Sequence, residues 1–323
     1  MTSASLAEWS NAAVYASMVV LTLSMVAFAV NFSARGTRGT QRSATVTTAM
    51  PIAVAVGAGG NEPVASPVAE VIDDPRGRRA GNIGLALAWL AFGLLLLGTT
   101  LRGVWAGRVP WGNMYEYSLS SAVAILGVYL IWSTRRDLRF LGLLVTGATL
   151  LTLGLAVTVL YTEAAQLVPA LKSWWLIIHV SAAAVCGGAF TVAAAMAGLY
   201  LWRERAERKN SVTGSVAKLP TASKLDMMTY RILAFAFPLW TFAVIAGAIW
   251  AENAWGRYWG WDPKETWAFI TWVIYAGYLH ARATAGWRGR RAAYIALLGW
   301  VSFLINYFGV NLFVNSLHSY AGV

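Results

Sequence analysis

The sequence is dominated by apolar runs of roughly 20 residues, separated by segments that carry basic residues. A run of about this length is long enough to cross the hydrocarbon core of a bilayer as an α-helix. Eight runs are predicted as spans, near residues 12–31, 83–101, 117–133, 139–160, 174–201, 231–250, 266–281 and 292–313. The pattern therefore predicts an all-α, polytopic membrane protein with about eight transmembrane helices.

Composition agrees with this class and excludes several others. Charged residues make up 12% of the 323 positions, about half the fraction of soluble domains. Cys186 is the single cysteine, which excludes a disulfide framework, a zinc cluster and a Cys-x-x-Cys-His heme-attachment motif. The net charge of +11 would suit nucleic acid, but it is explained by loops between spans, so no nucleic-acid partner is expected. The first apolar run lacks a basic leader and is expected to be a span rather than a cleavable signal.

The distribution of basic residues predicts the orientation in the membrane. Most of the 25 basic residues fall in the loops after spans one, three, five and seven. Cytoplasmic loops carry the excess of Lys and Arg, so these loops are predicted to face the cytoplasm. Both termini are then extracytoplasmic, and the expected location is the plasma (cytoplasmic) membrane.

Three regions are predicted along the chain. Residues 1–32 hold the first transmembrane helix. Residues 33–80 are rich in Gly, Ala, Pro, Ser and Thr and are predicted to be a disordered cytoplasmic linker, to which no function is assigned. Residues 83–323 form the main transmembrane domain.

Six of the 17 tryptophans lie within residues 250–272, around the polar turn Asp262-Pro263-Lys264. One interpretation is an aromatic belt, because Trp and Tyr gather at membrane–water interfaces. The other interpretation is a platform for a large, flat, apolar ligand. The predicted orientation places this segment at the outer face.

The polar turn also has a structural interpretation. Asp262 is a good N-cap, Pro263 suits the first helical position, and Glu265 completes a capping box. A role of Asp262 in ligand binding is compatible with this cap. Arg257 and Lys264 are the basic residues of the loop, and they either anchor it at the interface or pair with anionic groups of a ligand.

The three histidines fall at two depths. His179, near the start of the fifth span, and His318, after the eighth, lie on the outer side, whereas His280 lies deep in the seventh span. A single histidine is more often a packing residue than a ligand. Ionisable groups inside a membrane are costly and usually functional, which favours a role for His280. Neutral imidazoles suit iron, copper and zinc, and two of them beside an aromatic wall suit heme.

Four motifs together resemble one family. The segment "WGRYWGWDPKETWAFITW" closely resembles the tryptophan-rich WWD domain of heme-handling proteins. With "LVPALKSWWLIIHV", "WGNMYEYS" and "NSLHSYAG", residues 83–323 resemble the CcsA/ResC family of system II cytochrome c biogenesis, called CcsB in some bacteria.

This resemblance implies a heme site and a membrane partner. The WWD loop, residues 250–266, would hold heme b as cargo at the outer face, with His179 and His318 as axial ligands of the iron. The further residues implied in cofactor binding are Trp255, Trp259, Trp261, Trp267, Asp262, Arg257 and Lys264. His280 would belong to an inner heme site whose second ligand comes from a ResB-type membrane partner.

The family further implies a subunit of a system II cytochrome c synthase. Such a subunit binds heme, conveys it to the extracytoplasmic face and presents it for thioether attachment to the Cys-x-x-Cys-His motif of apocytochrome c. No residue resembles a conventional catalytic acid or base, so enzymatic activity is expected only within a heme lyase complex. One alternative is a heme exporter without ligation activity, which would give no covalent cytochrome. Another is a membrane diheme electron-transfer subunit, which would pair histidines at similar depths.

Overall fold

The computed structural model describes residues 3–37, 71–73, 75–163 and 172–318, and it confirms the predicted all-α class. The long helices are α1 (Ser3–Ala34), α2 (Pro75–Ala106), α3 (Met114–Ser133), α4 (Gly142–Thr158), α5 (Trp174–Arg208), α7 (Ala222–Trp255), α8 (Pro263–Ala283) and α9 (Arg290–Leu304). The short elements are the 3-10 turn η1 (Arg139–Leu141), α6 (Gly214–Ala217), the π-helical turn η3 (Ile305–Gly309) and α10 (Val310–Phe313). Two three-residue strands, β1 (Arg35–Thr37) and β2 (Val71–Asp73), pair in antiparallel fashion.

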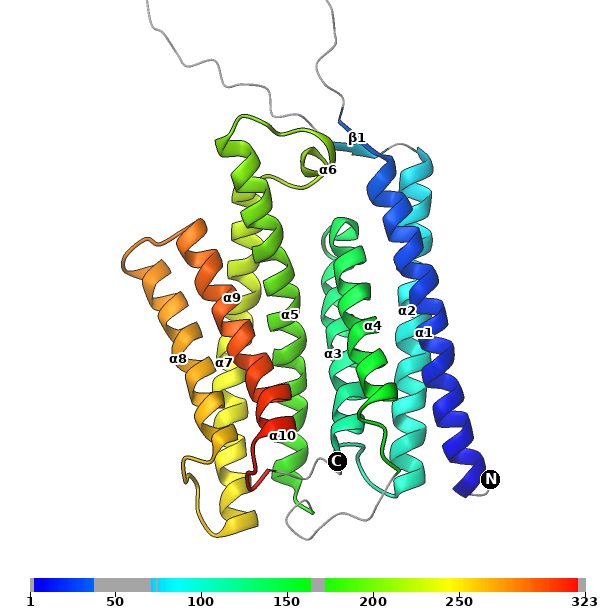
Figure 1. Ribbon diagram of the computed structural model, residues 1–323, viewed down its shortest axis with the longest axis vertical. Coiled ribbons are helices and arrows are strands. Elements are labelled where there is room, and N and C mark those ends of the chain that lie inside the picture. Colours follow the sequence, from blue (N-terminus) through cyan, green and yellow to red (C-terminus); the bar gives the residue numbers. More distant parts are fainter. Residues whose placement is uncertain (1–2, 38–70, 74, 164–171, 319–323) are drawn as a thin grey trace, which may run out of the picture.

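Seven helical segments of the described chain are long and apolar enough to cross a membrane. They are Ser5–Ala34, Pro75–Ala106, Met114–Ser133, Arg139–Thr158, Trp174–Arg208, Ala222–Trp255 and Arg290–Phe313. The remaining predicted span, 266–281, corresponds to α8, which has 21 residues but is more polar, with Lys264, Glu265, His280 and Arg282 on it. Helix α8 still stands in the bundle beside α7 and α9 (Figure 1). The protein is therefore a polytopic helical membrane protein, as predicted.

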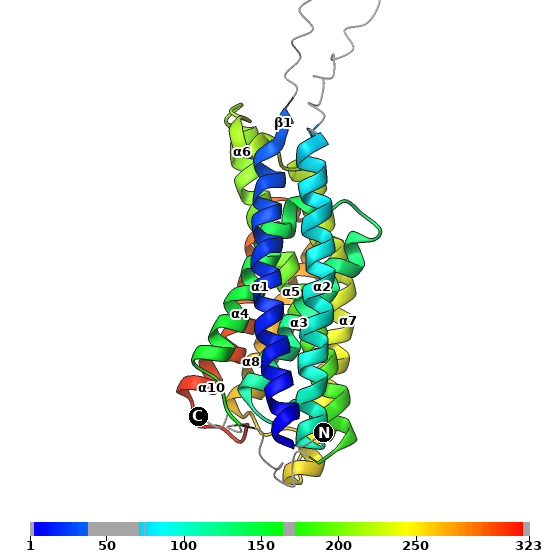
Figure 2. The ribbon, with the colours of Figure 1, turned by 90° about the vertical axis from the view of Figure 1, so that its right-hand side faces the viewer.

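Helices α1 and α2 run side by side along their length at one edge of the bundle (Figures 1 and 2). Their contact uses a seven-residue repeat of buried polar residues on α1, which are Ser10, Ser17, Ser24 and Asn31. Ser10 and Ser24 donate hydrogen bonds to the carbonyl oxygens of Gly98 and Gly84, at 2.8 and 2.7 Å. Small residues let helices approach closely in lipid, where side-chain to backbone hydrogen bonds add to the packing.

The predicted linker 33–80 is described only at its ends. Residues 38–70 and 74 lie outside the described residues. Helix α1 extends to Ala34 and is followed directly by β1, whereas β2 precedes α2, which begins at Pro75. Proline suits the first helical position because its missing N–H has no helical partner there.

The two ends of the bundle carry different loops and short elements. The start of α1, the α2–α3 loop, the α7–α8 loop and residues 314–318 lie at one end (Figure 1). Helix α6 and the β1–β2 pair lie at the opposite end. The Trp-rich loop and the segment that carries His318 therefore share one end of the protein, although they are separated by two helices in the sequence.

Candidate functional site

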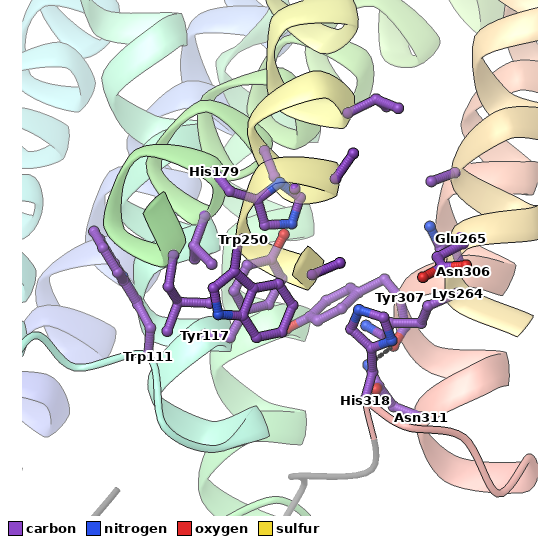
Figure 3. Close-up of a pocket in the computed structure, with 18 of the residues that line it drawn as sticks. Trp111, Tyr117, His179, Trp250, Lys264, Glu265, Asn306, Tyr307, Asn311 and His318 are labelled. Atoms are coloured by element: carbon purple, nitrogen blue, oxygen red, sulfur yellow. Dashed lines mark hydrogen bonds between the residues drawn. The ribbon is translucent and has the colours of Figure 1, made fainter. Parts of the chain in front are cut away.

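One cavity at the Trp-rich end is lined by both His179 and His318 (Figure 3). His179 comes from the second turn of α5, which begins after the N-cap Ser173. His318 comes from the non-helical segment that follows α10. The cavity also receives residues from α3, α7, α8 and the last helical turns, so it forms where the bundle helices converge.

His179 is held by a backbone carbonyl of the neighbouring helix. Its Nδ1 lies 2.7 Å from the carbonyl oxygen of Ala243 on α7. Helix α7 approaches closely because residue 247 is glycine, where a Cβ atom would lie 2.7 Å from the imidazole ring. A neutral imidazole that donates from Nδ1 keeps the lone pair of Nε2 for another partner.

His318 is held by Asp262, the N-cap of α8. The Nδ1 atom of His318 lies 2.9 Å from Oδ2 of Asp262, and the N–H of Leu317 donates to Oδ1 at 2.9 Å. Asp262 also accepts from the N–H of Lys264, and Glu265 Oε2 accepts from the N–H of Asp262, so the predicted capping box is present. Asp262 thus caps the helix and orients the histidine at the same time.

The pKa shifts of this pair favour a neutral imidazole beside a carboxylate. Burial lowers the pKa of His318, and the hydrogen bond with Asp262 opposes that shift without reversing it. Burial would raise the pKa of Asp262, but the hydrogen bonds from His318 and from the Leu317 N–H outweigh burial and lower it. At neutral pH His318 is therefore in the form that a metal ligand requires.

Tryptophan side chains surround the two imidazoles. The ring of Trp250 is nearly parallel to that of His179, at a centroid distance of 6.3 Å, and lies 5.6 Å from that of His318. Trp255 packs edge-on against His318 at 4.7 Å. Trp259 lines the cavity directly. Trp250, Trp255 and Trp259 are thus gathered around the histidines and their cavity.

Three predicted tryptophans do not line the cavity: Trp255, which lies behind His318, and Trp261 and Trp267. Trp261 has a positive φ of 57°, and its side chain is 64% exposed and packs edge-on against Trp259 at 5.7 Å. A non-glycine residue in this left-handed region is uncommon, and here it reverses the chain just before the N-cap of α8. Trp267 lies one turn into α8, outside the cavity lining.

The two basic residues of the loop have different positions. Lys264 lines the cavity (Figure 3). Arg257 is not part of the cavity lining; its guanidinium pairs with Glu265, which does line the cavity, at 3.4 Å, and covers Gly260. A Cβ atom at position 260 would overlap that guanidinium, so the glycine makes this pairing sterically possible. Of the two predicted anion partners, Lys264 is the one that faces the cavity.

Sequence reasoning missed several residues of the cavity wall. The wall also contains Trp111, Asn113, Tyr117, Trp250, Asn306, Tyr307 and Asn311. Asn306 lies in the π-helical turn, and its buried Oδ1 has no hydrogen-bond partner within the described chain. Single π-helical turns inside α-helices are frequent at functional sites. The signal in the sequence was the presence of two amides, Asn306 and Asn311, inside an apolar run, where polar groups are costly.

A buried charge cluster holds one part of the wall in place. Glu116 on α3 accepts from Arg102 Nε at 3.1 Å, from Arg108 at 2.6 Å and from the Gly112 N–H at 2.8 Å. The side chains of Arg102 and Glu116 are fully buried. The α2–α3 loop, which supplies Trp111 to the cavity, is therefore anchored to both flanking helices.

His280 lies elsewhere. It is in the last turn of α8, far along the helix from Asp262, and its side chain is exposed. No side chain of the described residues forms a hydrogen bond with its ring. Within the same residues, no group of three or more His, Cys, Asp and Glu side chains could hold a bare metal ion.

The fold and the cavity define a class: a polytopic helical membrane protein with two imidazoles in an aromatic cavity at one end. Residues 111–318 match the family described as cytochrome C assembly protein. The chain is 39% identical over 246 residues to the cytochrome c biogenesis protein CcsA of Guillardia theta, covering 70% of this chain and 80% of the relative. It is 36% identical over 287 residues to CcsA of Microcystis aeruginosa, covering 74% of this chain and 87% of the relative. The chain therefore belongs to the cytochrome c assembly family, with the CcsA-type biogenesis proteins, and the predicted resemblance is confirmed.

A solved structure supports the fold. The cytochrome c heme lyase CcmF superposes with a TM-score of 0.60 at 16% sequence identity, over 95% of this chain. This chain spans 47% of the length of that structure. At such low identity the likeness concerns the fold alone. Together, the family match and the relatives assign the chain a role in cytochrome c biogenesis.

Proposed function

We propose that the protein binds heme b as cargo in this cavity, with His179 and His318 as the two axial ligands. One observation carries the proposal: both imidazoles line the same cavity, and each has its Nδ1 directed to a protein oxygen. This arrangement leaves Nε2 of each ring for the iron. Two neutral histidines are a common axial set for heme.

The cavity walls suit both the apolar porphyrin ring and the anionic propionates of heme. Trp250 and Trp259 offer aromatic surface for the porphyrin. Lys264, Asn306 and Asn311 lie on the α8 and C-terminal side of the cavity, where an ammonium and two amides suit the propionates (Figure 3). Asp262 and Trp255 support the site from behind His318, and Arg257 supports the loop through Glu265.

Binding requires the cavity to widen. The cavity has a volume of about 190 Å³. Pockets that bury a drug-sized ligand measure roughly 300–1,000 Å³. Trp250 lies beside both imidazoles, and displacement of its side chain would open the space near them. We expect its indole to become a wall of the loaded site.

The bound heme would then be presented to apocytochrome c. The cysteine thiols of a Cys-x-x-Cys-His motif add to the heme vinyl groups and form thioether bonds. This chain contributes binding, orientation and exclusion of water. The protein thus acts as a synthase subunit of system II within a complex.

The Trp-rich end is proposed to be extracytoplasmic, in the plasma membrane. The segments 203–231 and 282–291, which hold seven and four basic residues, lie toward the opposite end of the bundle. The positive-inside rule assigns that end to the cytoplasm. The cavity then faces the compartment in which apocytochromes with free cysteines would receive heme.

His280 is proposed to receive heme from the membrane with a ResB-type partner. Its side chain is exposed on α8, and Gly277, one turn earlier, leaves open space beside it. The other two histidines of the chain line the outer cavity, so a second axial ligand at His280 comes from another chain. Ionisable residues inside a membrane are costly and are functional candidates by default.

The proposal is tested by purifying the protein with its partner and recording heme content and absorption spectra. We expect a low-spin, bis-histidine spectrum that is lost when both His179 and His318 are replaced. Supplying apocytochrome c then separates synthase from exporter. A covalent cytochrome product supports the synthase, whereas heme release without that product would support an exporter.

We predict that Gly247→Ala lowers heme occupancy strongly while the protein still folds. The added methyl group would lie 2.7 Å from the His179 ring, so α7 or the imidazole must shift. The matched control is Gly198→Ala on α5, where a Cβ atom meets no neighbour within 4 Å. Heme per folded molecule is measured for both variants. Equal occupancy in the two would show that the position of His179 does not control binding.

We predict that His280→Ala lowers heme at the outer cavity, although it contributes nothing to the cavity wall. We expect this loss because heme that is not captured in the membrane at His280 cannot reach the outer histidines. Heme per molecule is measured in complexes purified from cells and, separately, after addition of hemin to the detergent-solubilised protein. The loss should appear only in the first measurement. Normal loading in cells would contradict an entry role.

A further inference from the structure

The two imidazoles of the cavity differ in the partner of Nδ1. His318 faces the carboxylate of Asp262, with 2.9 Å between Nδ1 and Oδ2. His179 faces a neutral backbone carbonyl, with 2.7 Å between Nδ1 and the oxygen of Ala243. The partner of one ring nitrogen sets the tautomer and the basicity of the other nitrogen.

Asp262 uses both carboxylate oxygens. Its Oδ1 accepts from the Leu317 N–H, while Oδ2 accepts from the Lys264 N–H and faces His318. The side chain is buried. A helix cap needs a single acceptor, which Ser, Thr or Asn supplies equally well. The second oxygen has no role in the cap, and it joins α8 to the C-terminal segment across 55 residues of sequence.

We propose that Asp262 is a positioning residue that makes His318 the stronger, and His179 the weaker, of the two iron donors. The proposal rests on the bis-histidine heme site of the proposed function. A carboxylate that accepts the Nδ1 proton raises the basicity of a ligating imidazole, and loss of such a partner typically costs about 10- to 100-fold in metal affinity. A neutral carbonyl polarises the ring less. The two axial positions are therefore unequal before any substrate arrives.

The test is a set of single-histidine proteins with and without the carboxylate. His179→Ala keeps His318 with Asp262, and His318→Ala keeps His179 with its carbonyl. Each is combined with Asp262→Asn, which preserves an N-cap oxygen and hence the start of α8. The affinity of each purified full-length protein for hemin is measured by absorbance titration, with thermal unfolding recorded for every variant.

We expect His179→Ala to bind hemin about ten-fold more tightly than His318→Ala. Adding Asp262→Asn should abolish that advantage in the His179→Ala protein. The same change should have no effect in the His318→Ala protein, which therefore serves as the matched control. A purely structural role of Asp262 would weaken hemin binding in both backgrounds.

A second measurement uses the protein with both histidines. The reduction potential of the bound heme is compared between wild type and Asp262→Asn. We expect the variant to bind ferric heme in preference to ferrous heme about ten-fold less strongly, which corresponds to a rise of about 59 mV in reduction potential. The control is Glu252→Gln. This change also removes a carboxylate from the Trp-rich end of the bundle, but from the last turn of α7. That change should leave the potential near the wild-type value.

The outcomes separate the two proposals. If wild type binds hemin no more tightly than the His179→Ala/His318→Ala double variant, the proposed heme site fails, and the inference fails with it. If wild type binds tightly but the two single-histidine proteins bind equally, with or without Asp262→Asn, the heme site stands and the inference is overturned. Equal losses in both backgrounds would also overturn it.

Discussion

Replacing His179 or His318 with alanine is expected to abolish cytochrome c maturation while the protein still inserts in the membrane. Each change removes one of the two imidazoles that line the cavity. The loss of heme affinity should be at least the roughly 10- to 100-fold that follows removal of a supporting partner of a ligand. The measurements are covalent cytochrome c formed in cells and heme per purified molecule.

Added imidazole serves as the control for this prediction. It can occupy the vacated axial position, so it should partly restore both heme binding and maturation in either variant. It should not rescue Gly247→Ala, in which the imidazole of His179 is present but displaced. Normal maturation in both single alanine variants would rule out the bis-histidine site.

The second large effect is expected at Glu116, which lies outside the cavity. Glu116→Ala would leave Arg102 and Arg108 without their shared carboxylate, and Arg102 is fully buried. Removing one partner of a buried ion pair typically destabilises a protein by about 3–5 kcal/mol, because the other charge stays buried without compensation. We expect a loss of this size in the free energy of unfolding, measured by denaturant titration in detergent.

The control for Glu116 is an exposed ion pair of the same chain. Asp137 pairs with Arg139 at 2.8 Å, and its side chain is 53% exposed. Exposed pairs contribute about 0–1 kcal/mol, so Asp137→Ala should change stability little. If both variants lost the same small amount, the Arg102–Glu116–Arg108 cluster would have no special structural role. The loosened α2–α3 loop should also lower heme binding, since Trp111 lines the cavity.

Much of the fold was predictable because lipid imposes a simple rule on the sequence. A span must be an apolar helix of about 20 residues, so hydropathy located the long helices of the bundle. The orientation of the bundle in the membrane stays a prediction from the basic loops. The capping box at Asp262 was equally local, because its donors and acceptors lie within four residues. The shared end of His179 and His318 followed from counting spans.

Contacts between distant residues were decided by packing alone. No local pattern indicated that Asp262 would hold His318, or that Trp250 would lie beside both imidazoles. From the sequence, Arg257 and Lys264 were equal candidates for an anion partner, whereas in the structure Lys264 lines the cavity and Arg257 pairs with Glu265.

Sequence by itself therefore determined the membrane class, the helices and the common end of the bundle at which His179, His318 and the Trp-rich loop lie. Tertiary structure decided which side chains form the cavity. The physical reason is range: hydropathy and capping act within one helix, whereas the direction of a side chain depends on the neighbouring helices that pack against it.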